Sequence, residues 1–370
     1  MEFACENPAI ILDCGSFITR IGYQGDLEPR FIRPSLYKKK NIIERGIIKD
    51  WNILEKFFYN IFNKTLIIHP NEKNIFITQP INSPKSQKKK LLEMMIEKFK
   101  FKGVYLQNTL QLSSYSTGKL TGIICDSGEG LTQIGSIKDG LLYPNSIFQF
   151  EYAGKDVNEK LKQLITNNNL IENKNYLKDN NLIEDIKRKC CFVKYKEEKI
   201  VEEEPEEEKN KKPSKNAKKE EEPIEPVEEP IETIEYELPD KNKITLQNER
   251  IEPLEEFFGD NENSISKYIF NSINKSELEK KNILYKNIVL VGGNTKFENF
   301  GKRIKSELKN LVEDENIKQN IDVLEYNISQ ITAFNGASII SSFDTFKENW
   351  ISKEEYDECG FNYLLQNKLN

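Results

Sequence analysis

One short pattern occurs twice in the chain and restricts the fold more than any other feature of the sequence. Residues 12–17 read Leu-Asp-Cys-Gly-Ser-Phe, and residues 124–133 read Ile-Cys-Asp-Ser-Gly-Glu-Gly-Leu-Thr-Gln. In each copy an apolar strand runs into an aspartate, a polar residue and a glycine turn. Two such copies about a hundred residues apart predict two similar half-domains that face one nucleotide. Each half would supply a carboxylate for a metal and backbone N–H groups for phosphates.

The charge of the chain is concentrated in one segment. Residues 196–235 contain sixteen Glu and eight Lys, a net charge of −8, whereas the whole chain has −6, so the remainder carries +2. This segment has too little apolar surface to offset the entropy lost on ordering. We therefore expect a disordered Glu/Lys/Pro-rich insertion at 196–235, with order resuming near Ile234. The nearly neutral remainder predicts no direct nucleic-acid partner and no membrane partner.

Zinc sites and disulfide scaffolds are not expected. The six cysteines show no C-x-x-C spacing, and the single histidine, His69, has no metal-ligand companion nearby. The first residues are acidic, and no run of eighteen apolar residues occurs. These features predict a soluble, intracellular protein in a reducing compartment.

Strand and helix patterns alternate along the chain. Residues 9–24 predict two strands around a turn, and apolar runs predict further strands at 74–78, 121–125, 243–246 and 287–291. Apolar residues three and four positions apart predict helices at 54–62 and 88–99, and the segments 156–191 and 296–308 are also expected to be helical. This alternation predicts an α/β architecture.

A series of motifs, taken in order, resembles the actins and actin-related proteins. The first combines Asp13-Cys14-Gly15-Ser16 with the strand that follows, residues 22–30. The others follow at near-actin spacing over nearly the whole chain: 46–51, 126–130, 153–156, 236–250, 292–293 and 350–358. Any one of these segments is weak evidence, whereas seven in the same order are strong.

The resemblance implies the fold shared by actin, heat-shock chaperones and sugar kinases such as hexokinase, with a nucleotide cleft between two α/β domains. The implied small domain comprises residues 1–125 and the returning segment 325–370, and the implied large domain comprises 126–324. Between Pro34 and Glu44 only a few residues remain, where actin inserts a small subdomain that grips the next subunit of the filament. We therefore expect a shortened subdomain 2 and no polymerisation.

The resemblance also implies a binding site for ATP or ADP with Mg²⁺. Asp13 and Asp126 would hold the ion, mainly through waters. The remaining predicted contacts come from both halves. Phosphates would meet Ser16, Phe17 and Arg20 from one side and Gly128, Glu129 and Gly130 from the other, while the ribose and adenine would meet Gly154, Lys187, Arg188, Gly293, Lys296 and Phe297.

Two departures from the actin pattern bear on catalysis. Thr109 and Gln133 stand where actin has a glutamine and a histidine that orient the attacking water. A positioned acid–base group contributes about 10²- to 10⁴-fold in rate, so we expect very slow hydrolysis at most. An alignment shifted near Thr109 would instead give Gln107 or Gln111 this role.

Four further cleft positions differ from actin. Phe17 replaces a glycine, and Arg20 replaces a lysine but can still pair with phosphate. Arg188 replaces an acidic residue expected at the ribose, which removes an acceptor for its hydroxyl groups. Gln330 replaces a lysine near the adenine.

The resulting interpretation is a non-polymerising actin-related protein that serves as a structural subunit of a cytoskeletal assembly, such as a dynactin-like filament cap or a ciliary axonemal complex. Its expected partners are protein subunits, including an actin-like filament end or axonemal proteins, and its expected location is the cytoplasm, cytoskeleton or cilium. The alternatives are a nuclear chromatin-remodelling relative and an ATP-hydrolysing, polymerising actin. A nuclear relative could use the basic residues 209–219 for import, although the flanking Glu residues favour a solvated spacer.

Overall fold

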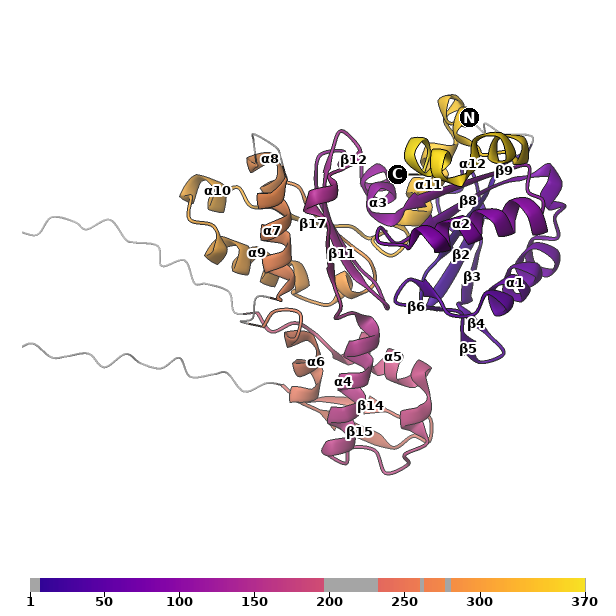
Figure 1. The fold of residues 1–370 in the computed structure, drawn as a ribbon. Coiled ribbons are helices and arrows are strands. Elements are labelled where there is room, and N and C mark those ends of the chain that lie inside the picture. Colours follow the sequence, from indigo (N-terminus) through magenta and orange to yellow (C-terminus); the bar gives the residue numbers. More distant parts are fainter. Residues whose placement is uncertain (1–6, 196–231, 260–262, 277–280, 370) are drawn as a thin grey trace, which may run out of the picture.

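The computed structural model of the chain describes residues 7–195, 232–259, 263–276 and 281–369. Two sheets with helices packed on them form two halves, which confirms the predicted α/β architecture (Figure 1). The predicted insertion lies outside the described residues up to 231. Order resumes at Ile234 as predicted, because Ile234 begins a strand in which it pairs with Leu246, so the limit of 235 given for the insertion is one residue or more too late.

The first half contains a five-stranded sheet with the order β3-β2-β1-β8-β9. Strands β1 and β2 form an antiparallel hairpin, and β8 and β9 continue the sheet in parallel. Helix α1 begins after Asp50, whose side chain accepts hydrogen bonds from the amides of Asn52 and Ile53. The bounds are β1 Ile10–Cys14, β2 Ile18–Tyr23, β3 Phe31–Pro34, α1 Trp51–Asn60, β8 Asn74–Gln79, α2 Lys85–Glu93 and β9 Gly103–Asn108.

The second half repeats this plan. Its main sheet has the order β12-β11-β10-β16-β17, with β10 and β11 as an antiparallel hairpin and β16 parallel to β10. The strands are β10 Gly122–Ser127, β11 Thr132–Lys138, β12 Leu141–Leu142, β13 Phe148–Phe150, β16 Ile288–Val291 and β17 Val323–Glu325, with β14 Ile234–Glu237 and β15 Lys243–Leu246 as a separate pair. The helices include α4 Gly154–Asn167, α5 Asn180–Cys190, α6 Glu252–Glu255, α7 Ile265–Lys275, α8 Asn282–Tyr285, α9 Phe300–Leu311 and α10 Glu315–Gln319.

Each half has its own hydrophobic core. One core draws its buried residues from 10–112 and again from 334–369, and the other draws them from 123–321. The C-terminal helices α11 Thr332–Ser341 and α12 Lys353–Asn367 lie against the first half (Figure 1). The domain limits given above remain a prediction, but these cores are the physical units on which they would rest.

The two halves meet at α3, Thr109–Thr117, which contacts β9 of the first sheet and β10 and β11 of the second, and which packs against α11. The hydroxyls of Ser113 and Thr332 are 2.9 Å apart. A Cβ atom on Gly336 would lie 1.9 Å from the carbonyl oxygen of Leu112, so only glycine permits this approach of the two backbones. This close contact fixes α3 against α11.

One local prediction needs correction, and one segment adopts a form that the sequence did not specify. The helix expected at 296–308 begins only at Phe300, because Asn299 has a left-handed φ of 65° that separates it from the short turn Asn294–Lys296. Between Pro34 and Trp51 the chain forms two small hairpins, β4 Leu36–Tyr37 with β5 Lys40–Asn41, and β6 Ile43–Glu44 with β7 Ile47–Ile48. Among the described residues, no helix is long and apolar enough to cross a bilayer.

Candidate functional site

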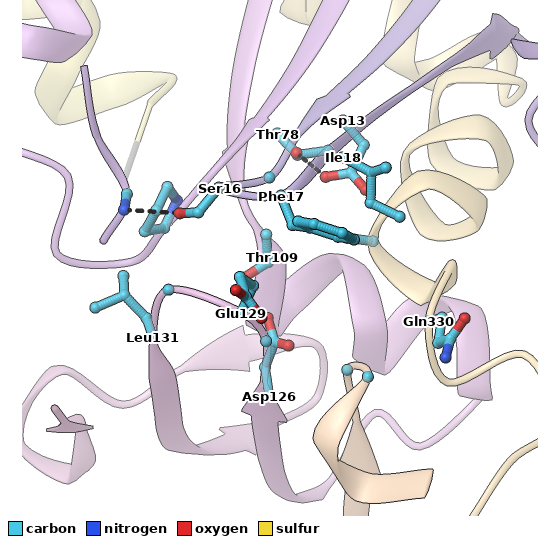
Figure 2. A pocket seen from close by; sticks show the side chains of 18 of the residues that line it. Asp13, Ser16, Phe17, Ile18, Thr78, Thr109, Asp126, Glu129, Leu131 and Gln330 are labelled. Atoms are coloured by element: carbon cyan, nitrogen blue, oxygen red, sulfur yellow. Dashed lines mark hydrogen bonds between the residues drawn. The ribbon is translucent and has the colours of Figure 1, made fainter. Parts of the chain in front are cut away.

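The β1–β2 and β10–β11 hairpins point at each other across a cavity of about 170 Å³ (Figure 2). Most of the predicted site residues line it, although their roles toward a nucleotide remain predictions. Those at the cavity are Asp13, Ser16, Phe17, Arg20, Thr109, Asp126, Gly128, Glu129, Gly130, Gln133, Arg188, Gly293 and Gln330.

The two hairpin tips have the same turn. The amide of Gly15 donates to the carbonyl of Ile18 at 3.1 Å, and the amide of Gly128 donates to that of Leu131 at 2.9 Å. Within the part of the chain that the structure describes, the backbone amides at positions 16, 17, 129 and 130 have no hydrogen-bond partner. Unpaired amides on two facing turns are the donors that an anion such as a phosphate requires.

The tips are also in contact with each other. A Cβ atom added to Gly130 would lie 2.4 Å from Oγ of Ser16, so glycine is needed at this point of approach. Ser16 Oγ in turn accepts a hydrogen bond from the amide of Gly46 at 3.3 Å (Figure 2). The first loop is therefore held between the second loop and the β6–β7 hairpin.

Both carboxylate oxygens of Asp13 are engaged by neighbouring side chains. Thr78 Oγ1 donates to Oδ1 at 2.5 Å, and Arg20 Nη1 donates to Oδ2 at 3.1 Å. Register explains both contacts: Arg20 lies directly opposite Asp13 in the hairpin, and Thr78 follows Ile77, the partner of Leu12 on β8. Arg20 thus contacts Asp13, whereas the sequence placed it at the phosphates.

Asp126 has a different environment. Burial raises its pKa to about 6, and the nearby charge of Asp13 adds to this, while Thr109 and Arg20 lower it. Thr109 Oγ1 lies close enough to influence Asp126, but it has no hydrogen-bond partner among the described residues. Thr109 reaches this place because Asn108 caps α3, its side chain accepting from the amide of Gln111 at 2.9 Å.

Gln133 is held by the backbone of the other half. Its Oε1 accepts the amide hydrogen of Ile81 at 2.8 Å, so the oxygen that could have oriented a water is already engaged. The shifted alignment is not supported either. Gln107 donates to Gln111, which donates to the carbonyl of Gly140, and neither glutamine lines the cavity.

A buried ionic cluster supports the second loop from behind. Lys187 is only 3% exposed and lies 3.4 Å from Glu129, 2.6 Å from Glu184 and 3.2 Å from the carbonyl of Gly154. Burial raises the pKa of Glu129. For Glu184 burial acts in the same direction, but Lys187 together with hydrogen bonds from Asn158 and Arg188 outweighs it, so the pKa of Glu184 is lowered. Gly154 and Lys187 contact the second loop and do not line the cavity, so their predicted contact with the ribose stays a prediction.

Glu184 lines the cavity and was missed by the sequence analysis. Its Oε1 accepts from Arg188 Nε at 2.7 Å, one helical turn further along α5. The carboxylate missing at Arg188 is therefore present at Glu184, on the same face of the helix. The sequence did carry a signal for this pair: a Glu and an Arg four residues apart in a segment expected to be helical.

Phe17 narrows the cavity. Its ring points into the space between the hairpins (Figure 2), and the same residue also lines a neighbouring cavity of about 380 Å³. Small-molecule sites are usually about 300–1,000 Å³. Phe17 borders both spaces.

Lys296 and Phe297 do not line the cavity. Lys296 Nζ donates to the carbonyl of Asn327 at 2.8 Å, and Phe297 is buried in the core of the second half. The late start of α9 explains this, because both residues lie on the turn before the helix. Gly293 is at the cavity, and next to it Gly292 has a φ of 94°.

Ion pairs connect the β6–β7 hairpin to α4 on the opposite side of the tips. Arg45 Nη2 lies 2.6 Å from Asp156 Oδ1, and Lys155 pairs with Glu44. These contacts bring the first half against the second at the outer end of the two cavities.

The residues present fit a nucleotide better than they fit a divalent cation. Three buried polar atoms at the cavity lack a partner among the described residues: Gln79 Oε1, Thr109 Oγ1 and Ser329 Oγ. Together with the unpaired amides they match a polar, anionic ligand. The carboxylates are less suited to Mg²⁺, because Asp13 is already paired with a cation. Among the described residues no group of three or more His, Cys, Asp and Glu side chains could hold a metal ion.

Comparison with known protein families agrees with this arrangement. The family model described as Actin matches residues 36–369, well over half of the chain. The matched segment includes the second hairpin and the C-terminal return, and the first hairpin precedes it. The chain belongs to the actin family, and its α/β fold is actin-like.

Proposed function

We propose that this protein is a nucleotide-binding, non-polymerising structural subunit of a multiprotein assembly, with little or no ATP hydrolysis. The observation that carries the proposal is the pairing of two intact phosphate-type turns with water-handling positions that cannot act. The turns keep their unpaired amides, while Gln133 is bound to the Ile81 amide and Thr109 is too short to replace a glutamine. Actin-family proteins generally bind ATP or ADP with Mg²⁺, which supports an adenine nucleotide as the ligand.

The expected hydrolysis rate follows from the lost positioning. Phosphoryl transfer depends almost entirely on positioning and electrostatic stabilisation. With both groups absent, and about 10²- to 10⁴-fold attributable to a positioned acid–base group, bound ATP would persist. The nucleotide then acts as a cross-link between the halves, because both hairpin tips would hold its phosphates.

The short hairpins between Pro34 and Trp51 support the non-polymerising role. The β4–β5 strands have only two residues each, which leaves no room for the subdomain with which actin grips its neighbour. A subunit without that contact fits the end of a filament or a single position in an assembly.

The cytoskeletal setting rests on the sequence resemblance at residues 350–358. Trp350 packs edge-on against Phe76 and Phe346, with ring centroids 6.3 and 5.1 Å apart, so it also has a packing role. A dynactin-like or axonemal complex is our first proposal for the assembly, and a nuclear remodelling complex is the alternative. Purification with bound partners distinguishes them by the identity of the proteins recovered.

The central experiment measures nucleotide content and turnover. After gentle purification, we expect ATP or ADP at about one per chain, phosphate release at the level of the protein-free control, and no sedimentable filaments. The double variant Thr109→Gln with Gln133→His restores the two actin side chains and should raise the rate by about 10²-fold or more.

A matched control makes the same substitution outside the cavity. Gln149 lies on β13 and does not line the cavity, so Gln149→His should leave the rate of phosphate release unchanged. Phosphate release by the wild type that accelerates with protein concentration, together with filaments, would show a polymerising ATPase and contradict the proposal. An empty cleft that takes up neither ATP nor ADP would contradict nucleotide binding itself.

A further inference from the structure

We propose that Arg20 acts as a built-in cation at the site, so that the protein binds its nucleotide without a divalent metal. This inference rests on the proposed function, because it specifies the ionic form of the ligand that the same cavity takes: the metal-free nucleoside di- or triphosphate.

The geometry around Asp13 is the first support. Its two oxygens accept from Thr78 at 2.5 Å and from Arg20 at 3.1 Å, and the side chains of Arg20 and Asp13 are only 14% and 8% exposed. A divalent ion at this carboxylate would have to displace the guanidinium or lie against it. Like charges in a poorly hydrated cleft repel strongly.

The register of the hairpin makes this pairing a property of the fold. Arg20 is the residue directly across from Asp13, as Gln133 is directly across from Asp126. The corresponding residue in the second hairpin is neutral and bonded to the Ile81 amide, so it supplies no charge to the cavity. The asymmetry gives the first hairpin a positive charge that the second lacks.

The other cationic side chains near the cavity are already paired with carboxylates. Arg20 and Arg188 are the cationic residues lining the cavity in the described part of the chain. Arg188 is engaged by Glu184 at 2.7 Å. Lys187 is buried behind the second loop, where it lies 2.6 Å from Glu184.

Guanidinium chemistry suits the task. Arginine carries five N–H donors in a planar fork and stays charged at all accessible pH values. One Nη–H suffices for Asp13, which leaves donors for phosphate oxygens beside the free amides of both turns. The cation that the actin family generally obtains from Mg²⁺ is thus supplied by the chain itself.

The decisive test compares nucleotide affinity with and without metal. Binding of ATP and of ADP to the full-length protein is measured by calorimetry, once in excess Mg²⁺ and once in EDTA. We expect the two dissociation constants to agree within about threefold.

The alternative results separate the inference from the function. Binding in Mg²⁺ that weakens by more than about tenfold in EDTA would overturn the role of Arg20 while leaving nucleotide binding intact. No binding under either condition would overturn both.

Substitutions at Arg20 test the residue directly. Arg20→Gln gives the first hairpin the residue of the second, and its binding should become dependent on Mg²⁺, with a loss of about tenfold or more in EDTA. Arg20→Lys gives the residue that actin has at this position together with Mg²⁺, so its binding should also become dependent on Mg²⁺, although less than that of Arg20→Gln. Arg33→Ala removes an exposed arginine outside the cavity and should behave like the wild type.

An independent readout avoids reliance on affinity. With Mn²⁺ as the probe, electron paramagnetic resonance of the ATP complex should show protein-bound Mn²⁺ in Arg20→Gln and much less in the wild type. Equal Mn²⁺ binding in both proteins would contradict the inference. If Arg20→Gln does not fold, the wild-type comparison in Mg²⁺ and EDTA still decides it.

Discussion

The two hairpins that face the cavity share a backbone and differ in their side chains. In both, the amide two residues after the aspartate bonds the carbonyl three residues further on, at 3.1 Å in the first and 2.9 Å in the second. Around this common turn the environments diverge. Asp13 is bonded by Thr78 and Arg20, whereas Asp126 is half-buried and has no ion pair within the described part of the chain.

This difference shows which part of the site depends on backbone and which depends on side chains. The free amides that suit phosphate come from the turn itself, so they survive substitution. Metal and water handling depend on individual side chains, and there the hairpins have changed separately. Nucleotide retention and loss of turnover are therefore compatible in one cleft.

The largest predicted effect concerns the residues beside each aspartate on the neighbouring strand, and it is an effect on stability. Thr78 lies beside Asp13, and Val291 is the register partner of Asp126. Gly292 follows Val291, and a Cβ there would lie 2.2 Å from the carbonyl oxygen of Ser127. Gly292→Ala should lower the free energy of unfolding by about 3 kcal/mol, from the clash and the left-handed φ of 94°. Denaturant unfolding measures the loss.

The control for this change is a glycine with free space around its Cα atom. A Cβ on Gly259 meets nothing within 4 Å, so Gly259→Ala should stay within about 0.5 kcal/mol of the wild type. Equal stability of Gly292→Ala and Gly259→Ala would show that the second hairpin tolerates a side chain at its neighbouring strand.

Replacing Asp126 and replacing Asp13 should have opposite effects on stability at pH 7. The folded pKa of Asp126 is raised from 3.8 to about 6, so the folded state binds the extra proton and wild-type stability falls as pH rises from about 4 to 6. Asp126→Asn should therefore be more stable than the wild type at pH 7 by about 2–3 kcal/mol, with no advantage below pH 4. Unfolding of nucleotide-free protein across pH 4–8 measures the difference.

The opposite sign is expected in the first hairpin. Asp13→Asn leaves the buried guanidinium of Arg20 without its partner and should destabilise the protein at pH 7. Because the other acidic residues are unchanged, the difference from wild type reports each aspartate. Parallel pH curves for Asp126→Asn and wild type would contradict the environment described for Asp126.

The smallest effect concerns the fifth position of the motif. The first hairpin has Phe17 where the second has Gly130, and the ring narrows the cavity. Phe17→Gly should tighten nucleotide binding by about tenfold, because no side chain has to rotate before the ligand enters. Calorimetric titration with ATP measures this change.

An exposed phenylalanine provides the comparison. Phe343 is 59% exposed and lies outside the cavity, so Phe343→Gly should leave ATP affinity unchanged. Weaker ATP binding by Phe17→Gly would mean that the ring contacts the ligand rather than obstructs it.

The sequence predicted the parts of the site that depend on short-range pattern. The strands and glycine turns around Asp13 and Asp126 follow from local apolar runs and glycine spacing, and the structure places both turns at one cavity. The helix start predicted at Lys296 was wrong, since the left-handed backbone of Asn299 leaves no periodic signal in the sequence. Glu184 was missed because its role depends on the face that α5 presents to the cavity.

By itself, the sequence determined the α/β architecture and the paired Asp-x-Gly turns, since alternating apolar periods and glycine positions act over a few residues. Only the tertiary structure decided what the side chains at those turns do. Arg20 pairs with Asp13, Gln133 binds the Ile81 amide, and Phe17 enters the cavity. Each result requires strand register or contact between the halves, which residue type alone does not encode.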